Sequence, residues 1–521
     1  MISKLAFSGS RDAELFTKEI EHSVRGAIDH LLDMNPESPS YGFMQASFDG
    51  RPWTDTMWTR DAGVMLRELA CFGALDEAKA LAECLMNMVS LNPDGYYTFP
   101  EHLDRGVPGW GHELDGTASI VIGLVFLMRR LCKNDPVRAR AKAFLASPES
   151  PVAFVKEKLK NQALIAGSGE FGGGCGIDGM HVNAVQNALI RGMLIVYAHF
   201  LTEEGEEADN LIALSDVMRK GLFDLLTDEN GAWLWCVNAE TLLPDPEVLN
   251  HPINKGLGHI NDIAALLSDI EGALPEDAEM LSQGERTMNR DYSYPRRKFL
   301  FDRFGMWLQF DLWMNAGLSS PSYAMGYALQ AMALFDRTDW LSKGVRFLAE
   351  VTYDNPLPIT RRDRYWFYER ILAEDILDIQ DSWEGCGALN LVNVAEPMKV
   401  ARLIAGLDCA QNGKIVYAPR LPAHWQSISV NDWLLPMNAS LVSVSCRYER
   451  FRGNAPEGAY VSAKDLSGEG YALFWNCEAL PDEVRFGPFS SPEIAFSTGQ
   501  KVTITRSGDG LYWALVTRDA E

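Results

Sequence analysis

The chain has 521 residues, a formal net charge of −24 at pH 7 and a hydrophobic share of 47%. A single core usually stops growing at roughly 250–300 residues, so the length predicts one large domain with a smaller one beside it. Nucleic acids and anionic membranes attract Lys and Arg rather than carboxylates, so the acidic balance argues against both as partners.

The N-terminus and the cysteines predict a cytoplasmic protein. Residues 1–10 lack the basic and apolar regions of a signal peptide, and no uncharged apolar run approaches the roughly 20 residues that span a bilayer. The nine cysteines are an odd number and form no CxxC pair. This pattern argues against a disulfide framework and against a zinc site.

Up to about residue 410, the apolar spacing predicts helices. Met65, Leu69 and Phe72 follow the i, i+4, i+7 pattern, and the segments 120–131 and 185–196 repeat it. Further helices are expected at 12–34, 76–91, 206–227, 256–271, 300–317, 322–336, 340–352, 364–377 and 397–406. One more region, 136–160, should be helical on both sides of an interruption at Pro148 and Pro151.

The connections between these helices are of two kinds. Short polar turns such as 73–76 and 202–205 join antiparallel helices, and they alternate with long loops at 92–114, 162–182, 229–255 and 354–386. Long loops in a compact domain are usually functional or disordered, and tryptophans in these loops argue against disorder. The pattern predicts a closed ring of helical hairpins with a pocket at its loop-rich end.

After Asp408 the sequence becomes β-prone. Short runs at 441–448, 471–475, 501–505 and 511–516 are separated by Gly, Pro and Asp turns, as in a small antiparallel sandwich. We therefore divide the chain into a helical domain, 1–410, and a C-terminal β domain, 411–521.

The first cluster of residues that could bind or transform a substrate is Trp58-Thr59-Arg60-Asp61, which opens a helix. Arg60 offers a fork of donors and Asp61 offers acceptors, a pair suited to vicinal hydroxyl groups. The alternative is that Asp61 only complements the positive end of the helix.

A second cluster contains Trp110, His112, Glu113 and Asp115 and leads into another helix. Two carboxylates in one short turn, beside two aromatic side chains, are suited to binding sugar hydroxyl groups. Simple helix capping by Asp115 is the alternative.

A third cluster is the glycine-rich segment 169–181, which carries Glu170, Asp178 and His181. Its six glycines would let the backbone approach a ligand closely. A flexible surface loop is the alternative.

The fourth cluster contains Trp383 and Glu384 between small residues. Glu384 could be a carboxyl of raised pKa or one that activates water. Three rivals, Glu369, Glu374 and Asp375, follow a helical pattern typical of a solvated face.

Other chemistries lack their signatures. The sequence has no GxSxG elbow, no HExxH pair and no GxGxxG after a strand, so we expect no metal and no cofactor. Paired carboxylates in an aromatic pocket are the usual means of breaking glycosidic bonds. A small carbohydrate is therefore the expected substrate.

The segment Trp58-Thr59-Arg60-Asp61-Ala62-Gly63 resembles the segment after the first hairpin of glucoamylases. Gly176-Ile177-Asp178 looks like the acid segment of trehalases and processing α-glucosidases, and Trp383-Glu384-Gly385 is weakly similar to their base segment. The chain thus resembles the six-hairpin glycosidases, which are (α/α)6 barrels, over about residues 12–408.

The resemblance implies an inverting, exo-acting glycoside hydrolase. It assigns Asp178 as the general acid, with Glu170 in reserve, and Glu384 as the base, with the two carboxyl groups roughly 6.5–9.5 Å apart. It also implies that Arg60 and Asp61 bind hydroxyls of the terminal sugar. The Trp-Glu-Glu motif that carries the acid in glucoamylases is missing, so the resemblance does not identify the sugar that is cleaved.

Two other functions fit the same fold. A sugar phosphorylase would need a phosphate site, for which Arg361, Arg362 and Arg364 are candidates. A non-catalytic carbohydrate-binding protein would keep the pocket without the cleavage. The sequence leaves the oligomeric state open.

Overall fold

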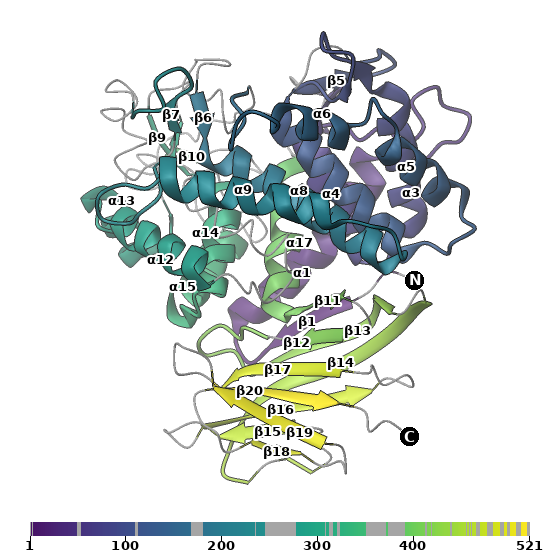
Figure 1. The fold of residues 1–521 in the computed structure, drawn as a ribbon. Coiled ribbons are helices and arrows are strands. Elements are labelled where there is room, and N and C mark those ends of the chain that lie inside the picture. The colour runs from purple at the N-terminus through teal and green to yellow at the C-terminus, as the bar shows by residue number, and fades with distance from the viewer. Residues whose placement is uncertain are drawn as a thin grey trace.

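A computed structural model of the 521-residue chain gives the architecture (Figure 1). It describes residues 2, 4–48, 54–109, 113–167, 181–234, 236–244, 278–307, 309–311, 316–319, 323–350, 371–372, 391–411, 414–417, 419–437, 440–454, 456–457, 459, 461–464, 469–476, 483–489, 494–496, 501–506 and 512–517.

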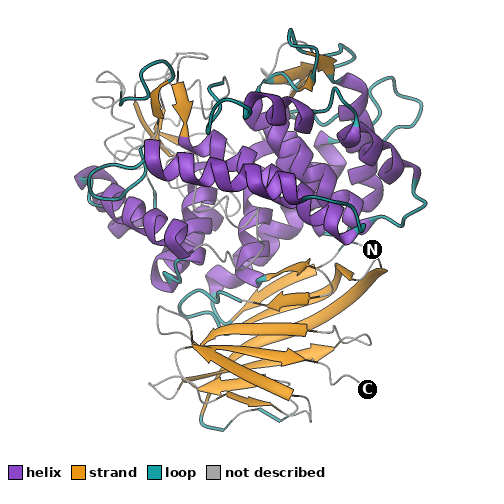
Figure 2. Ribbon diagram, viewed as in Figure 1, coloured by secondary structure: helices purple, strands orange, loops and turns teal. Residues whose placement is uncertain are grey.

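Helical hairpins build the larger part of the molecule, with a β domain below them in the view of Figure 2. The described helices are α1 (Arg11–Gly26), continued by the π-helical turn η1 (Ala27–Leu31), α2 (Thr59–Cys71), α3 (Leu75–Met88), α4 (Leu114–Arg130), α5 (Pro136–Ala146), α6 (Pro151–Lys158), α8 (Ala184–Glu203), α9 (Asp209–Leu225), α12 (Ala278–Tyr292), α13 (Pro295–Phe304), α14 (Tyr323–Leu334), α15 (Thr338–Ala349) and α17 (Leu391–Ala405).

Inner and outer helices differ in burial. The helices α2, α4 and α8 are buried on nearly all sides, whereas α3, α5 and α9 bury one face. The helix α2 packs against α4, α4 packs against α8, and the late helix α17 returns to pack against both α14 and α2. The predicted toroid of helical hairpins with a C-terminal β domain is therefore confirmed.

The helices α2 and α4 cross at backbone contact. A Cβ added to Gly63 would lie 2.4 Å from the carbonyl carbon of Ser119, and one added to Gly123 would lie 2.7 Å from the Gly63 oxygen. Real Cβ atoms essentially never come so close, so both glycines are needed for this crossing. The close crossing fixes the starts of the two helices relative to each other.

The helix α8 lies within the core. Among the described helices it alone is long and apolar enough to cross a bilayer, and 89% of its most apolar window is buried inside the protein. A buried core helix can be as long and as apolar as a membrane-spanning helix, so the length and composition of α8 agree with its place in the core.

The β domain consists of two sheets. One has the order β1-β13-β14-β16-β15-β18, and the other β11-β12-β17-β20-β19. Their strands are β1 (Lys4–Ser8), β11 (Leu407–Gln411), β12 (Lys414–Tyr417), β13 (Ser427–Met437), β14 (Ser440–Arg452), β15 (Val461–Lys464), β16 (Glu469–Asn476), β17 (Glu483–Phe489), β18 (Ile494–Phe496), β19 (Lys501–Arg506) and β20 (Tyr512–Thr517).

The N-terminal strand β1 belongs to the β domain, although α1 directly follows it. It pairs antiparallel with β13, from Lys4 opposite Asn431 to Ser8 opposite Ser427. The Phe7 ring lies 5.1 Å from that of Trp425, which also contacts the α1 residue Phe16 at 6.0 Å. The β domain is thus connected to both ends of the helical region, through β1 before α1 and through β11 after α17. The boundary near residue 410 stays a prediction.

Short strands form small ladders within and between the segments that connect the helices. The strand β2 (Thr56–Trp58) pairs with β5 (His102–Asp104), β3 (Ser90–Leu91) with β4 (Tyr97–Thr98), and β6 (His181–Asn183) with β7 (Cys236–Asn238); β9 (Ala316–Ser319) lies between β8 (Gln309–Asp311) and β10 (Ile371–Leu372). In Figure 1 the labelled strands β5, β6, β7, β9 and β10 lie on the side away from the β domain.

Two predicted helices were wrong in part. The helix expected at 300–317 begins at Pro295 and ends at Phe304, because Gly305 adopts a left-handed conformation with φ of 84°. Within the range 364–377, Ile371–Leu372 is a strand that pairs with β9. The rest of that range and the helix expected at 256–271 lie outside the described residues.

Candidate active site

The first turn of α2 carries the Arg60–Asp61 pair in a buried position. Trp58 precedes the helix in an extended conformation, and its side chain makes no capping hydrogen bond. The Arg60 Nε lies 3.4 Å from the Asp61 Oδ1, and only 5% and 9% of the two side chains are exposed. Burying a guanidinium and a carboxylate is costly unless they are paired. The pair is therefore more than a solvated helix end.

Trp58 lies at the edge of this site. It is half-buried, and its ring centroid is 5.5 Å from that of His102, its partner across the β2–β5 ladder. The pairing brings the loop after β4 against the start of α2.

The start of α4 supplies two further buried carboxyl groups. Glu113 and Asp115 are 2% and 0% exposed. The Glu113 N–H donates to the Phe99 carbonyl at 2.6 Å, and Asp115 Oδ1 accepts the Gly116 N–H at 2.7 Å. Asp115 thus binds the N–H of the next residue from inside the helix and is not the N-cap residue that the capping alternative expected. Glu113 is the N-cap residue, but its side chain makes no capping hydrogen bond.

Glu113 has the most perturbed carboxyl group of this cluster. Burial raises its pKa well above the ordinary range, and the charge of nearby Asp115 raises it further. Arg60 lowers the pKa, Glu101 raises it, and a hydrogen bond to the Asp115 side chain adds to the rise. Glu113 therefore keeps its proton at a pH where an exposed glutamate has lost it.

The two helix starts are in contact. A Cβ on Gly116 would lie 2.1 Å from the Thr59 Oγ1 and 3.1 Å from the Glu113 Oε2. Only glycine fits here without displacing either group. The structure thus brings together the first two predicted clusters, through Arg60, Asp61, Glu113 and Asp115.

The start of α8 lies beside the same place. Asn183 caps this helix by accepting the Gln186 N–H at 3.1 Å, and buried His181 begins the strand β6 just before it. Gly167 lies between the helices, because a Cβ there would lie 2.4 Å from Leu114 Cδ1 and 2.7 Å from Gln186 Nε2. The starts of α2, α4 and α8 thus form one continuous group.

Half of the predicted site residues lie outside the described residues. These are the acid candidate Asp178, the reserve Glu170, the base candidate Glu384, and Trp110, His112 and Trp383. Their roles stay predictions.

Two residues of this region were missed at the level of sequence. Glu101 is exposed and close enough to Glu113 to raise its pKa, and buried Thr59 lies between the two helix starts. The position of Glu101 depends on the pairing of β2 with β5, which has no local sequence signal. Thr59 lies inside the Trp58-Thr59-Arg60-Asp61 segment. Its small side chain with a hydroxyl group, which can hydrogen-bond to a neighbouring backbone, was the only sign of its role in the sequence.

No metal site is evident in the part of the chain that the structure describes. There, no group of three or more His, Cys, Asp or Glu side chains is arranged to hold an ion. The described chemistry of the site is that of carboxyl groups and one guanidinium.

The fold and the grouped helix starts define a class of structure, the toroid of helical hairpins with a β domain. The sequence matches no protein-family model and no curated protein. Solved structures with this fold include the GH78 family rhamnosidase of Bacillus sp. GL1, with 14% identity, a TM-score of 0.54 and coverage of 86% of this chain and 40% of that one.

Two other solved structures extend the comparison. The α-L-rhamnosidase of Streptomyces avermitilis, complexed with L-rhamnose, is 14% identical with a TM-score of 0.53, and the match covers 99% of this chain and 41% of that one. A D-mannose isomerase is 11% identical with a TM-score of 0.51, and the match covers 75% and 98%. The chain spans about two fifths of the length of either rhamnosidase. These likenesses establish the fold, which hydrolases and an isomerase share.

Proposed function

We propose that the protein is a glycoside hydrolase that binds the terminal sugar of a small glycoside at the starts of α2 and α4. The observation that carries this proposal is the buried Glu113–Asp115 carboxyl pair beside the Arg60–Asp61 ion pair. Support also comes from the rhamnosidases that share the fold.

The four side chains offer complementary hydrogen-bonding groups. The single proton of Glu113 is used in its hydrogen bond to Asp115, so the remaining carboxyl oxygens of this pair and those of Asp61 can accept from sugar hydroxyl groups. The Arg60 guanidinium presents a planar fork that matches two neighbouring oxygens. Such a set favours a polyhydroxylated, uncharged ring.

For the cleavage itself, the proposal takes the roles that the family resemblance implies. Asp178 donates a proton to the leaving glycosidic oxygen, and Glu384 activates the water that attacks the opposite face of the sugar. This is an inverting reaction, and binding of one terminal sugar makes it exo-acting. The rhamnose-bound relative suggests α-L-rhamnosides as the first substrates to test.

The test is a turnover screen with 4-nitrophenyl α- and β-glycosides of L-rhamnose, D-glucose and D-mannose and with disaccharides, in buffer with and without phosphate. We expect hydrolysis of at least one glycoside, with a product anomer of inverted configuration in proton NMR. Phosphate-dependent release of a sugar phosphate would show a phosphorylase. Interconversion of free mannose and fructose would show an isomerase, and sugar binding without turnover would show a binding protein.

Variants assign the residues. Asp178→Asn and Glu384→Gln should abolish turnover while the glycoside still binds. Asp61→Asn should weaken both turnover and binding of the glycoside. Glu170→Gln is the matched control, and we expect it to keep turnover. Loss in Glu170→Gln with activity in Asp178→Asn would exchange the two assignments.

A further inference from the structure

Thr59 holds the loop before β5 against the start of α2. Its Oγ1 donates a hydrogen bond to the Pro100 carbonyl at 2.6 Å, and its N–H donates to the Glu101 carbonyl at 3.1 Å. The Thr59 side chain is fully buried. This loop is the one that brings the Glu101 carboxylate toward Glu113.

Thr117 holds the other side of the same loop against α4. Its Oγ1 donates to the Glu113 carbonyl at 2.5 Å and accepts the Phe99 N–H at 3.0 Å. The Glu113 N–H in turn donates to the Phe99 carbonyl at 2.6 Å. Phe99 is thereby fixed to the same turn that carries Glu113.

We propose that Thr59 and Thr117 are positioning residues whose hydroxyl groups fix the loop 99–101 between α2 and α4. They thereby set the spacing of the Arg60–Asp61 pair relative to the Glu113–Asp115 pair. That this spacing serves a sugar ligand rests on the proposed function.

The hydroxyl groups, rather than the bulk of the side chains, carry the effect. Removing the Thr117 hydroxyl leaves the buried Phe99 N–H without its acceptor, and a buried donor without a partner favours a shift of the backbone. There is little space to absorb such a shift, because Thr59 Oγ1 already lies against Gly116. Movement of the loop would therefore change the distances among Glu101, Glu113 and Arg60.

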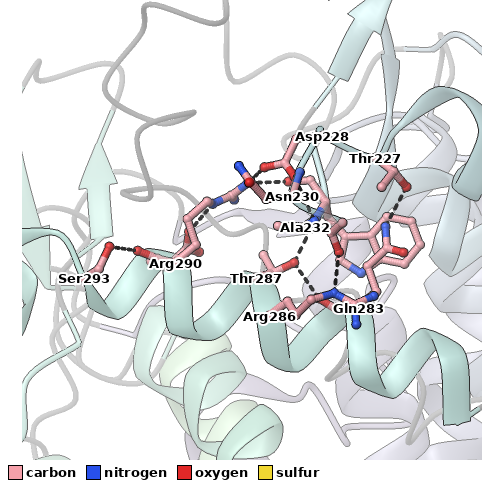
Figure 3. Close-up of polar contacts among 12 residues, drawn as sticks. Thr227, Asp228, Asn230, Ala232, Gln283, Arg286, Thr287, Arg290 and Ser293 are labelled. Carbon is pink, nitrogen blue, oxygen red and sulfur yellow. Dashed lines mark hydrogen bonds and ion pairs between the residues drawn. The ribbon is translucent and has the colours of Figure 1, made fainter.

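The chain contains a matched arrangement elsewhere (Figure 3). In α12, Thr287 Oγ1 donates to the Gln283 carbonyl at 2.8 Å and accepts the Trp233 N–H at 2.9 Å. Like Thr117, it is buried, bonds the carbonyl four residues before it, and anchors a loop residue. Thr287→Val therefore reproduces the chemical change of Thr117→Val in another hairpin.

The first measurement needs no substrate. In the full-length protein labelled with carbon-13 at glutamate carboxyl groups, the Glu113 resonance is assigned by its loss in Glu113→Gln. We expect Thr59→Val and Thr117→Val each to move its titration midpoint by about 0.5 pH unit or more, since the charges around Glu113 change distance. Thr59→Ser and Thr117→Ser should restore the wild-type midpoint, and Thr287→Val should leave it unchanged while lowering the melting temperature as Thr117→Val does.

The second measurement is the steady-state kinetics of the 4-nitrophenyl glycoside with the highest kcat/KM. The two valine variants at the site should lower kcat about 10-fold or more, because misplaced groups bind the transition state poorly. An unmoved Glu113 titration in both, or an equal movement in Thr287→Val, would overturn the positioning role. A moved titration in a protein that cleaves no glycoside would leave the positioning role standing and overturn the hydrolase.

Discussion

Glu68 in α2 and Arg402 in α17 form a buried, bidentate ion pair between residues 334 positions apart in the chain. The Arg402 Nε lies 2.9 Å from Glu68 Oε2, and its Nη2 lies 3.0 Å from Oε1. Arg67 adds a third hydrogen bond to Glu68 at 2.8 Å. Because α17 is the last described helix of the ring and α2 an early one, this pair fastens the closure of the toroid.

Removing the charge of Glu68 should destabilise the protein strongly. In Glu68→Gln two buried guanidinium groups lose their counter-ion, which we expect to cost about 3–5 kcal/mol of unfolding free energy in urea. Glu285→Gln is the control, since its pair with Arg337 spans 2.6 Å at a site where 33% and 44% of the two side chains are exposed, and should cost about 1 kcal/mol or less. Equal losses would show that the pair does not fasten the ring.

The same pair predicts an acid dependence. Burial alone would raise the pKa of Glu68, but Arg402 and Arg67 outweigh it and hold the pKa below the ordinary value of 4.5. The folded state then releases this proton more readily than the unfolded state, so the contribution is complete above pH 4.5 and is lost on further acidification. The stability gap between wild type and Glu68→Gln should therefore narrow below pH 4.5.

The stability of Glu113→Gln relative to wild type should change with pH in the direction opposite to that of Glu68→Gln. Because the pKa of Glu113 is raised, the unfolded state loses its proton first, and stability falls as the pH rises above 4.5. Glutamine imitates the protonated acid and carries no such loss. Relative to wild type, the variant should gain about 1.4 kcal/mol per pH unit in urea unfolding at successively higher pH, until the folded pKa is reached. A gain that is the same at pH 4 and pH 8 would contradict the raised pKa.

The helical hairpins could be predicted because their apolar spacing repeats over several turns. Pairings between distant segments could not, as the strands β2 and β5 show: each has three residues, too few for a pattern, and they lie more than 40 positions apart. Glu101 was missed for this reason. The chemistry of the clusters at Arg60 and Glu113 was visible in residue types, whereas their contact depends on Gly116 and its missing Cβ.

The N-terminal strand should matter as much as a core helix. Phe7 is 3% exposed and packs its ring against those of Phe16 and Trp425, at 5.5 and 5.1 Å. Phe7→Ala should lose about 3–5 kcal/mol, measured by urea unfolding. Phe299→Ala is the control, because that side chain is 48% exposed and should change stability by about 0.5 kcal/mol or less. A small loss at Phe7 would indicate that β1 is dispensable for joining the two domains.

Alanine variants of Gly116 and Gly123 distinguish the contribution of α4 to helix packing from its contribution to the candidate site. A Cβ at Gly116 meets Thr59 Oγ1 at 2.1 Å, and a Cβ at Gly123 meets the Gly63 carbonyl oxygen at 2.7 Å. Both alanine variants should lose about 1–3 kcal/mol of stability, since neither position has room for a methyl group. Only Gly116→Ala also pushes on Glu113, so only it should weaken the binding of a monosaccharide such as L-rhamnose, measured by calorimetry below the melting temperature of both variants. Equal weakening in Gly123→Ala would mean that binding follows the crossing of the helices rather than the carboxyl groups at their starts.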